Sequence, residues 1–491
     1  MDLGSILTFL ECKSILVTGA TGFIAKILVE KILRTQPKVG KLYLLVRAAD
    51  TNSANQRLQD EMINKELFRV MKEKWGGGLN TFISEKVVPV AGDISCEDLG
   101  VKETGLMEEM WREVDVVVNL AATTNFDERY DIALGLNTMG PKYIVNFAKK
   151  CAKLKLLVHV STAYVWGEKG GLMPETPFRM GEALNGTLGL DVDVEMKLVQ
   201  ERLQQLEDTK ATEREIKIAL KELGIERARK YGWPNTYVFT KAMGEMLVGS
   251  LKGDMPLVIL RPTIITSTYK EPFPGWVEGL RTIDSLAVGY GKGRLTCFLG
   301  DPDSIIDAIP ADMVVNSIIV AMAANASQSC QTTIYQVGSS VKNPVKFTYI
   351  QDIGYRYFTS HPLSDKQGKP VIVGKVKVLS TMASFNRYMS IRYMLPLKGL
   401  ELVNAAFCQQ FRSLHSELDR KVKFVMRLVE LYRPYLFFEG IFDDINTEKL
   451  RLAAKCSYHE ADEFCFDPET IDWEDYFMNI HIPGLVKYVL K

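Results

Sequence analysis

Hydrophobic residues occur in short uninterrupted runs through the first 160 residues, and longer stretches with helical spacing separate these runs. We predict a helix over 23–33 and strands at Ser14–Thr18, Lys41–Val46, Lys86–Val90, Val114–Asn119 and Leu156–Val160. Apolar runs without polar alternation are typical of parallel strands buried on both faces. Strands that alternate with helices form βαβ units, so the pattern predicts an α/β fold with a doubly wound parallel sheet.

This alternation of strands and helices is interrupted once and later ends. Residues from about 168 to 230 form a Gly/Pro-containing loop and a charged helical stretch, which we interpret as an insertion of one or two surface helices. The strand pattern resumes at Leu257–Leu260, and the final third is helical. We therefore expect an N-terminal domain over 1–345 and a helical C-terminal domain over 385–491. Its apolar residues at helical spacing are Leu400, Val403, Phe407, Phe411 and Leu414.

Composition excludes some classes of protein. The chain has 491 residues, of which 47% are hydrophobic, and its 60 basic residues balance 60 acidic ones. Nucleic-acid binding requires a basic excess, so we exclude it as a main function. The eight cysteines and five histidines are scattered. We therefore expect neither a metal site nor a disulfide framework.

The sequence predicts no membrane-spanning helix, because no window reaches about 18 apolar residues. The nearest candidate, 313–326, is too short, and the first residues resemble neither a secretory signal nor a transit peptide. A peripheral position on a membrane remains open. The stretch 399–414 and the aromatic cluster of Tyr435–Phe438 with Ile441 and Phe442 are candidate membrane-facing surfaces. The alternative is that they are core faces of the C-terminal domain.

A glycine-rich turn follows the first predicted strand and opens the first helix. Gly19 permits the tight turn, Gly22 lets the backbone approach a pyrophosphate, and the small Ala25 keeps helix and sheet close. The phosphates would lie on the helix N-terminus, so we expect Thr21, Phe23 and Ile24 to contact the cofactor as well. A glycine-rich turn without a ligand is the competing interpretation.

Three further strand ends fit a dinucleotide. Arg47 ends the second strand, where an arginine pairs with a 2′-phosphate, so NADPH is favoured over NADH. Asp93 and Ile94 follow the third strand, and the carboxylate can accept from the adenine amino group or act as a helix N-cap. Ala121 lies in a small-residue segment after the fourth strand, as a cofactor lying over the strand end requires.

Tyr237 and Lys241 are four residues apart, on one face of a predicted helix. A nearby lysine and a nicotinamide cation would lower the pKa of the phenol and make Tyr237 a usable general acid. Ser161 and Thr162 end the fifth strand and supply hydroxyls for an oxyanion, or they merely cap the strand end. A tyrosine and lysine at this spacing carry weight only because they follow a dinucleotide-binding unit.

These motifs resemble the extended short-chain dehydrogenase/reductase family. More specifically, the chain resembles the plant alcohol-forming fatty acyl-CoA reductases of the jojoba and male-sterility type. The resemblance covers nearly the whole length and rests on long matching strings at 121–130, 232–246, 261–265, 271–276 and 442–449. It implies a Rossmann-type sheet with a helical C-terminal domain, and alignment of the strand-end motif favours Thr162 over Ser161 as the catalytic hydroxyl.

The resemblance also implies an activity. NADPH would reduce a long-chain fatty acyl-CoA to a primary alcohol for wax or other lipid-barrier synthesis, with Thr162, Tyr237 and Lys241 as catalytic residues. Pro262 and Ile264 would line the nicotinamide pocket. The alternatives are a reductase that stops at the aldehyde, an extended reductase of another carbonyl substrate, and a protein that only binds NADP. By resemblance we expect a peripheral protein on the cytosolic face of the endoplasmic reticulum.

Overall fold

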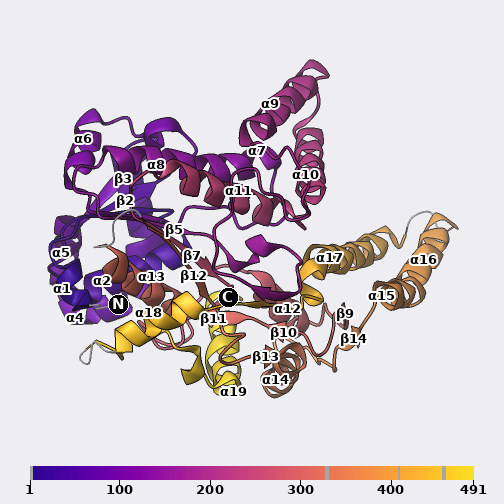
Figure 1. Ribbon diagram of the computed structural model, residues 1–491. Helices are drawn as coiled ribbons and strands as arrows, with labels where there is room; N and C mark the ends of the chain where they lie inside the picture. Colours follow the sequence, from indigo (N-terminus) through magenta and orange to yellow (C-terminus); the bar gives the residue numbers. More distant parts are fainter. Residues whose placement is uncertain (1–3, 327–330, 407–409, 456–459, 491) are drawn as a thin grey trace.

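The computed structural model describes residues 4–326, 331–406, 410–455 and 460–490. A parallel seven-stranded sheet lies at the centre of the larger part, in the order β12-β7-β5-β4-β1-β2-β3 (Figure 1). Its strands are β1 (Ile15–Thr18), β2 (Leu42–Val46), β3 (Val87–Ala91), β4 (Val116–Asn119), β5 (Leu156–Val160), β7 (Leu257–Pro262) and β12 (Thr332–Val337). The predicted α/β class and every predicted strand are confirmed, and β12 is an additional strand that we did not predict.

Helices cover both faces of this sheet because successive side chains of each strand point to opposite faces. In β1, Ile15 and Val17 join one hydrophobic core and Leu16 joins another. One face carries α1 (Ile6–Leu10), α2 (Phe23–Thr35) and α13 (Ala311–Asn325), and the other carries α6 (Thr104–Glu113), α8 (Gly140–Lys150) and α11 (Thr236–Leu251). Beside β2 and β3 lie α3 (Thr51–Leu58), α4 (Arg69–Trp75) and α5 (Leu79–Lys86).

The predicted insertion contains two helices, α9 (Val192–Asp208) and α10 (Glu213–Lys230), which project from the sheet domain (Figure 1). Each begins at a capping side chain. Asp191 accepts from the backbone of Asp193 and Val194, and Thr212 forms a capping box with Glu215. The short α7 (Tyr130–Ala133) lies at the base of the pair, where the hydroxyl of Tyr130 donates to Glu195.

The C-terminal part does not stand apart from the sheet domain. Strand β15 (Gly440–Phe442) pairs in parallel with β6 (Gly171–Met173), and α18 (Ile445–Lys455) packs against β12 and α13. The carboxylate of Glu460 accepts from the backbone N–H of Ile6 at 2.7 Å. The remaining helices and strands lie in both parts of the chain after β7: α12 (Thr282–Gly291), α14 (Phe347–Ser360), α19 (Trp473–Asp475), α20 (Ile482–Tyr488), β8 (Ile264–Thr266), β9 (Cys297–Leu299), β10 (Ile305–Ile306), β11 (Ala308–Pro310), β13 (Val345–Lys346) and β14 (Lys377–Leu379).

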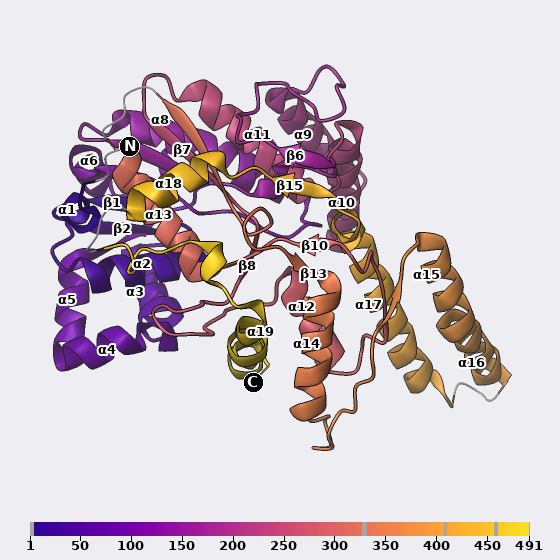
Figure 2. The same cartoon turned by 60° about the horizontal axis from the view of Figure 1, so that its bottom comes forward.

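Three helices form an arm that projects from the rest of the molecule: α15 (Met382–Met389), α16 (Leu395–Ala406) and α17 (Arg412–Leu436) (Figure 2). The predicted apolar stripe over 399–414 is therefore divided between two helices, and Phe407 lies outside the described residues. The far end of α17 returns to the sheet domain.

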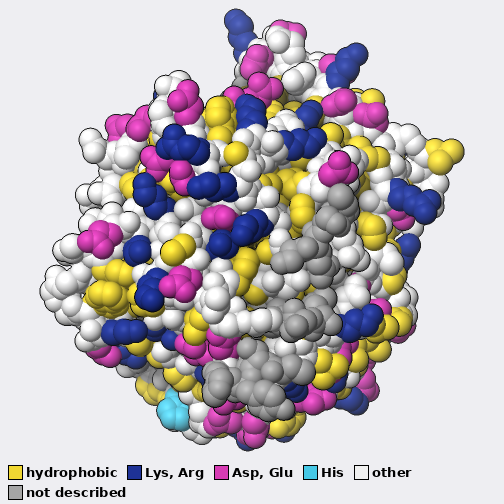
Figure 3. Space-filling view, turned by 60° about the vertical axis from the view of Figure 1, so that its left-hand side comes forward, with side chains coloured by type: hydrophobic (Ala, Val, Ile, Leu, Met, Phe, Trp, Pro, Cys, Tyr) yellow, Lys and Arg dark blue, Asp and Glu magenta, His cyan; other side chains and the backbone are white. Residues whose placement is uncertain are grey.

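The chain has equal numbers of basic and acidic residues. On the face around α1 and α5, side chains of both charges are mixed, and neither charge forms a large patch (Figure 3). Among the described residues, no helix is long and apolar enough to cross a membrane. The candidate stretch 313–326 lies largely in α13, which is buried in the core.

Candidate active site at the carboxyl edge of the sheet

The glycine turn after β1 forms a cradle at the N-terminus of α2. Gly19 has a φ of +64°, and a Cβ there would lie 2.8 Å from the Cα of Ala121. The hydroxyl of Thr18 accepts from the backbone N–H of Ala121 at 3.0 Å, which fixes this close approach. Gly22 precedes α2 without a side-chain cap, so the first N–H groups of the helix are free to bind an anion. This geometry fits the pyrophosphate of a dinucleotide.

Other predicted cofactor residues surround this cradle. Thr21 and Ile24 are half-buried, whereas Phe23 is buried and stacks on Trp276 with ring centroids 5.2 Å apart. The side chain of Phe23 therefore belongs to the core, and its backbone N–H at the helix start is the group open to a phosphate.

The three residues that we predicted at the adenosine end of the cofactor have different surroundings. Arg47 is exposed just beyond β2. One carboxylate oxygen of Asp93 accepts from the backbone N–H of Ser95 at 2.9 Å and from its hydroxyl at 2.7 Å. Asp93 thus stabilises its own turn but does not cap a helix, because the N-cap residue of the short helix that follows is Cys96. Ile94 is buried against Gly140 at the start of α8.

Thr162, Tyr237 and Lys241 meet where β5 ends beside α11. The hydroxyl of Thr162 lies near enough to the phenol of Tyr237 to lower its pKa, and it is 3.4 Å from the carbonyl oxygen of Pro262. The Nζ of Lys241 donates to the carbonyl oxygen of Val160 at 2.7 Å. Tyr237 is half-buried and Lys241 is buried. The structure therefore brings the three predicted catalytic side chains to one place.

The pKa of Tyr237 differs from our expectation. Burial raises it to about 12, and only the hydrogen bond from Thr162 lowers it. Burial also lowers the pKa of Lys241 to about 8, an effect that the carboxylate of Glu245 partly opposes. Lys241 points its ammonium at a backbone carbonyl, so in the protein itself the lysine does not lower the pKa of the phenol as the sequence suggested.

Ser161 and Thr162 are not equivalent. The hydroxyl of Ser161 is buried and has no hydrogen-bond partner among the described residues, whereas that of Thr162 faces Tyr237. Behind them, Asn119 contacts the Nδ1 of the buried His159 at 3.0 Å. Burial, with the charge of Lys241, lowers the pKa of this histidine well below its usual value. The geometry favours Thr162 as the reacting hydroxyl.

A buried ion pair lies at the end of β7. Pro262 is buried at the end of β7, and Ile264 follows half-buried in β8. Next to them, Arg261 pairs with Glu245 at 2.6 Å and stacks near the ring of Phe178. The Nε and Nη2 of Arg261 bind Glu245 and the carbonyl oxygen of Thr176, so this arginine ties the end of β7 to α11, although its buried Nη1 has no partner among the described residues.

An aromatic layer over Tyr237 was not predicted. Phe126 stacks on Tyr237 with ring centroids 5.7 Å apart, and α17 brings Tyr432 and Tyr435 against the other side of Phe126. The nearest sequence signals were the string at 121–130 and the aromatic cluster at 435–438, which we interpreted as a candidate membrane surface. Tyr435 is half-buried and accepts a hydrogen bond from Asn235, which fits the alternative that this cluster belongs to a core face.

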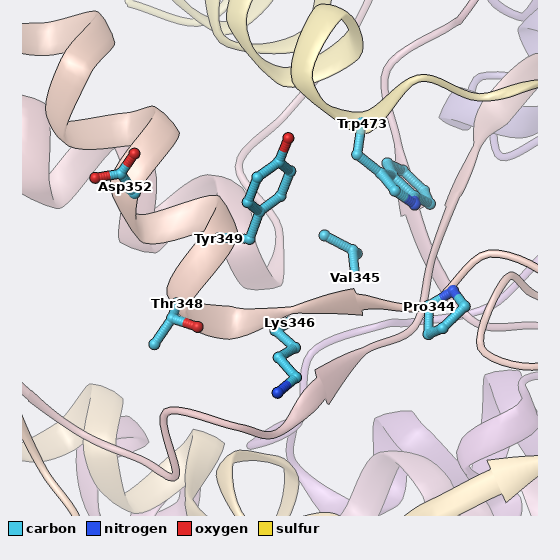
Figure 4. Close-up of a pocket in the computed structure, with 7 residues that line it drawn as sticks. All are labelled: Pro344, Val345, Lys346, Thr348, Tyr349, Asp352 and Trp473. Carbon is cyan, nitrogen blue, oxygen red and sulfur yellow. The ribbon is translucent and has the colours of Figure 1, made fainter.

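A surface hollow of about 520 Å³ lies elsewhere, between β13, α14 and α19 (Figure 4). Its lining residues are Pro344, Val345, Lys346, Thr348, Tyr349, Asp352 and Trp473. None of these belongs to the group around Tyr237. Among the described residues, no cluster of His, Cys, Asp or Glu could hold a metal ion.

The doubly wound sheet, the glycine cradle and the Thr162–Tyr237–Lys241 group define a reductase of the extended short-chain type with a nicotinamide-dinucleotide site. Solved structures share this fold. The terminal R domain of the myxalamid PKS-NRPS pathway matches with a TM-score of 0.56 and 18% identity, over 97% of this chain and 91% of that one.

Sequence relatives narrow the class. Family models described as "Male sterility protein" match residues 17–318 and 392–491. The "Alcohol-forming fatty acyl-CoA reductase" of Simmondsia chinensis is 58% identical over 100% of both chains. "Fatty acyl-CoA reductase 1" of Arabidopsis thaliana is 54% identical over 98% of both. The chain therefore belongs to the plant fatty acyl-CoA reductase family.

Proposed function

We propose that this protein is an alcohol-forming fatty acyl-CoA reductase, which reduces a long-chain acyl thioester to a primary alcohol through an aldehyde-level intermediate. The observation that carries the proposal is that Thr162, Tyr237 and Lys241 converge at the end of β5, beside the dinucleotide cradle. The full-length similarity to the Simmondsia chinensis reductase supports the substrate class. NADPH, when bound, supplies the hydride for each of the two reductions.

The residues around Tyr237 can serve both reductions. A phenol whose pKa is raised to about 12 is protonated at neutral pH, so Tyr237 enters each step as an acid that protonates the substrate oxygen. Thr162 donates a second hydrogen bond to that oxygen. Collapse of the hemithioacetal releases coenzyme A and leaves an aldehyde carbonyl facing the same two hydroxyls. Lys241, with a pKa of about 8, is largely protonated at neutral pH and would hold the nicotinamide ribose.

The test is product analysis with purified protein, NADPH and saturated acyl-CoAs of increasing chain length. We expect fatty alcohol by gas chromatography, with two NADPH oxidised for each coenzyme A released. Aldehyde with one NADPH oxidised would instead establish the aldehyde-forming alternative. Absence of acyl-CoA-dependent NADPH oxidation would overturn the proposed function.

We also propose that NADPH is preferred over NADH. Arg47 is exposed just beyond β2, where a guanidinium can pair with the 2′-phosphate. Arg47→Ala should raise the KM for NADPH by about tenfold, the factor that corresponds to about 1.4 kcal/mol, and should leave NADH use nearly unchanged. Equal losses with both cofactors would show that Arg47 has a structural role instead.

The proposed location is the cytosolic face of the endoplasmic reticulum, with the arm of α15–α17 on the lipid. No residue of α16 is buried, and Leu395, Leu402 and Val403 are exposed. Residues 382–406 contain three basic residues (Arg387, Arg392 and Lys398) and one acidic residue, Glu401. Exposed apolar residues with a basic excess fit an anionic membrane surface. Recovery of the protein wholly in the soluble fraction, before any salt or carbonate wash, would rule out stable attachment.

A further inference from the structure

The last turn of α17 reaches into the catalytic group from the far end of the sequence. Tyr435 lies there, and its hydroxyl accepts a hydrogen bond from the Nδ2 of Asn235 at 2.7 Å. The Oδ1 of the same Asn235 accepts from the backbone N–H of Val238 at 3.1 Å and caps the N-terminus of α11. Tyr237 lies two residues after this cap. One amide side chain therefore links Tyr435 to the helix turn that carries the proposed acid.

Aromatic ring contacts form a second connection between Tyr435 and Tyr237. Phe126 contacts both Tyr237 and Tyr435, with ring centroids 5.7 Å and 5.3 Å from them. The loop that carries Phe126 is itself held by α17, because Arg427 forms an ion pair with Asp127. Lys221 of α10 pairs with the same carboxylate at 3.1 Å. The position of Phe126 over the phenol thus depends on contacts from α17 and from the insertion.

The environment of Tyr435 shows that these contacts are buried. Burial raises the pKa of its phenol, and a charge on Tyr237 would raise it further, so the two phenols are close enough to influence one another. The ring of Tyr435 also meets Tyr164 edge to face at 5.2 Å, and Tyr164 contacts Phe438 and Phe442. In such a packed aromatic layer, a displaced ring displaces its neighbours.

We propose that Tyr435 is a positioning residue for the reduction: through Asn235 and Phe126 it holds the Tyr237 phenol against Thr162. The C-terminal domain is then part of the catalytic unit, because α17 orients the acid that α11 carries. This inference rests on the proposed role of Tyr237 and adds to it a requirement for a residue of the C-terminal domain.

Tyr435→Phe tests the proposal because it removes only the hydroxyl and keeps the ring. We expect kcat to fall about fivefold, the effect of about 1 kcal/mol from one lost hydrogen bond, with KM for acyl-CoA and for NADPH changed less than about twofold. Asn235→Ser keeps a capping oxygen and removes the Nδ2 donor, so it should lower kcat similarly. Because both variants break one interaction, the double variant should be no slower than either single variant.

The matched control is Tyr393→Phe. Tyr393 also belongs to the C-terminal part and shares a hydrogen bond with Thr296 at 2.6 Å, but no described ring contact joins it to the layer over Tyr237. This variant should keep the wild-type kcat. An unchanged kcat in Tyr435→Phe, or additive losses in the double variant, would overturn the positioning role. A Tyr237→Phe enzyme with full activity would instead overturn the proposed function itself.

Discussion

Two apolar helices of similar length have opposite surroundings in this molecule. Helix α13 packs against α2, α18 and the strands β5 and β7, and nearly all of its residues are buried. Helix α16 has no buried residue and lies on the projecting arm (Figure 2). Hydrophobicity alone therefore does not say whether a helix belongs to the core. The partner that a helix meets in the fold decides, and α16 meets none among the described residues that buries it.

The two helices belong to parts of the molecule with different surfaces. The buried half, which contains α13, includes the sheet whose edge carries Thr162, Tyr237 and Lys241. The arm, which contains α16, exposes Leu395 and Leu402. Helix α17 joins the two parts, since it begins in the arm and carries Tyr435 in its last turn. Changes in the buried half and at the end of α17 should affect chemistry or folding, whereas changes in α16 should affect only the proposed membrane binding.

The largest expected effect is on chemistry in the buried half. Tyr237→Phe removes the proton donor and keeps the ring that packs on Phe126. General acid catalysis is worth about 10²–10⁴-fold, so kcat should fall by that factor while NADPH binding and thermal stability stay unchanged. Steady-state kinetics together with a cofactor titration measure this. A variant that keeps most of its activity would show that another group supplies the proton.

The sequence predicted the sheet well, and it also singled out Thr162, Tyr237 and Lys241, which the fold brings to one strand end, because both depend on local patterns. Strands buried on both faces are unbroken apolar runs, and the glycine cradle is continuous in the chain. The contribution of Tyr435 could not be found this way, since Asn235 and Tyr435 are distant in sequence and only the return of α17 brings them together. The pKa of Tyr237 in the protein alone could not be found this way for the same reason: the spacing to Lys241 is visible in the sequence, but the direction of its ammonium toward Val160 is not.

The next effect concerns stability and separates the two helices directly. Ile318 in α13 is 0% exposed, and Ile318→Ala should reduce the free energy of unfolding by about 2–5 kcal/mol through lost burial and a cavity. Leu402 in α16 is 74% exposed, and Leu402→Ala should change it by less than about 0.5 kcal/mol. Denaturant unfolding of both variants measures the contrast. Equal losses would mean that the arm is covered in solution, for example by another copy of the chain.

The smallest expected effect is on membrane binding, and it tests the exposed arm. Leu402→Asp replaces an apolar side chain that would insert among lipids with a charge, so partitioning to vesicles of mixed neutral and anionic lipid should weaken at least about tenfold. The matched control is Leu188→Asp, because Leu188 is 91% exposed on the insertion rather than on the arm.

Co-sedimentation with vesicles measures the binding of both variants. Wild-type binding should decrease at high salt because Arg387, Arg392 and Lys398 contribute electrostatically. In detergent, Leu402→Asp should retain the wild-type kcat. If both aspartate variants lose binding equally, or the wild-type protein does not bind vesicles, the arm is not the lipid-facing surface.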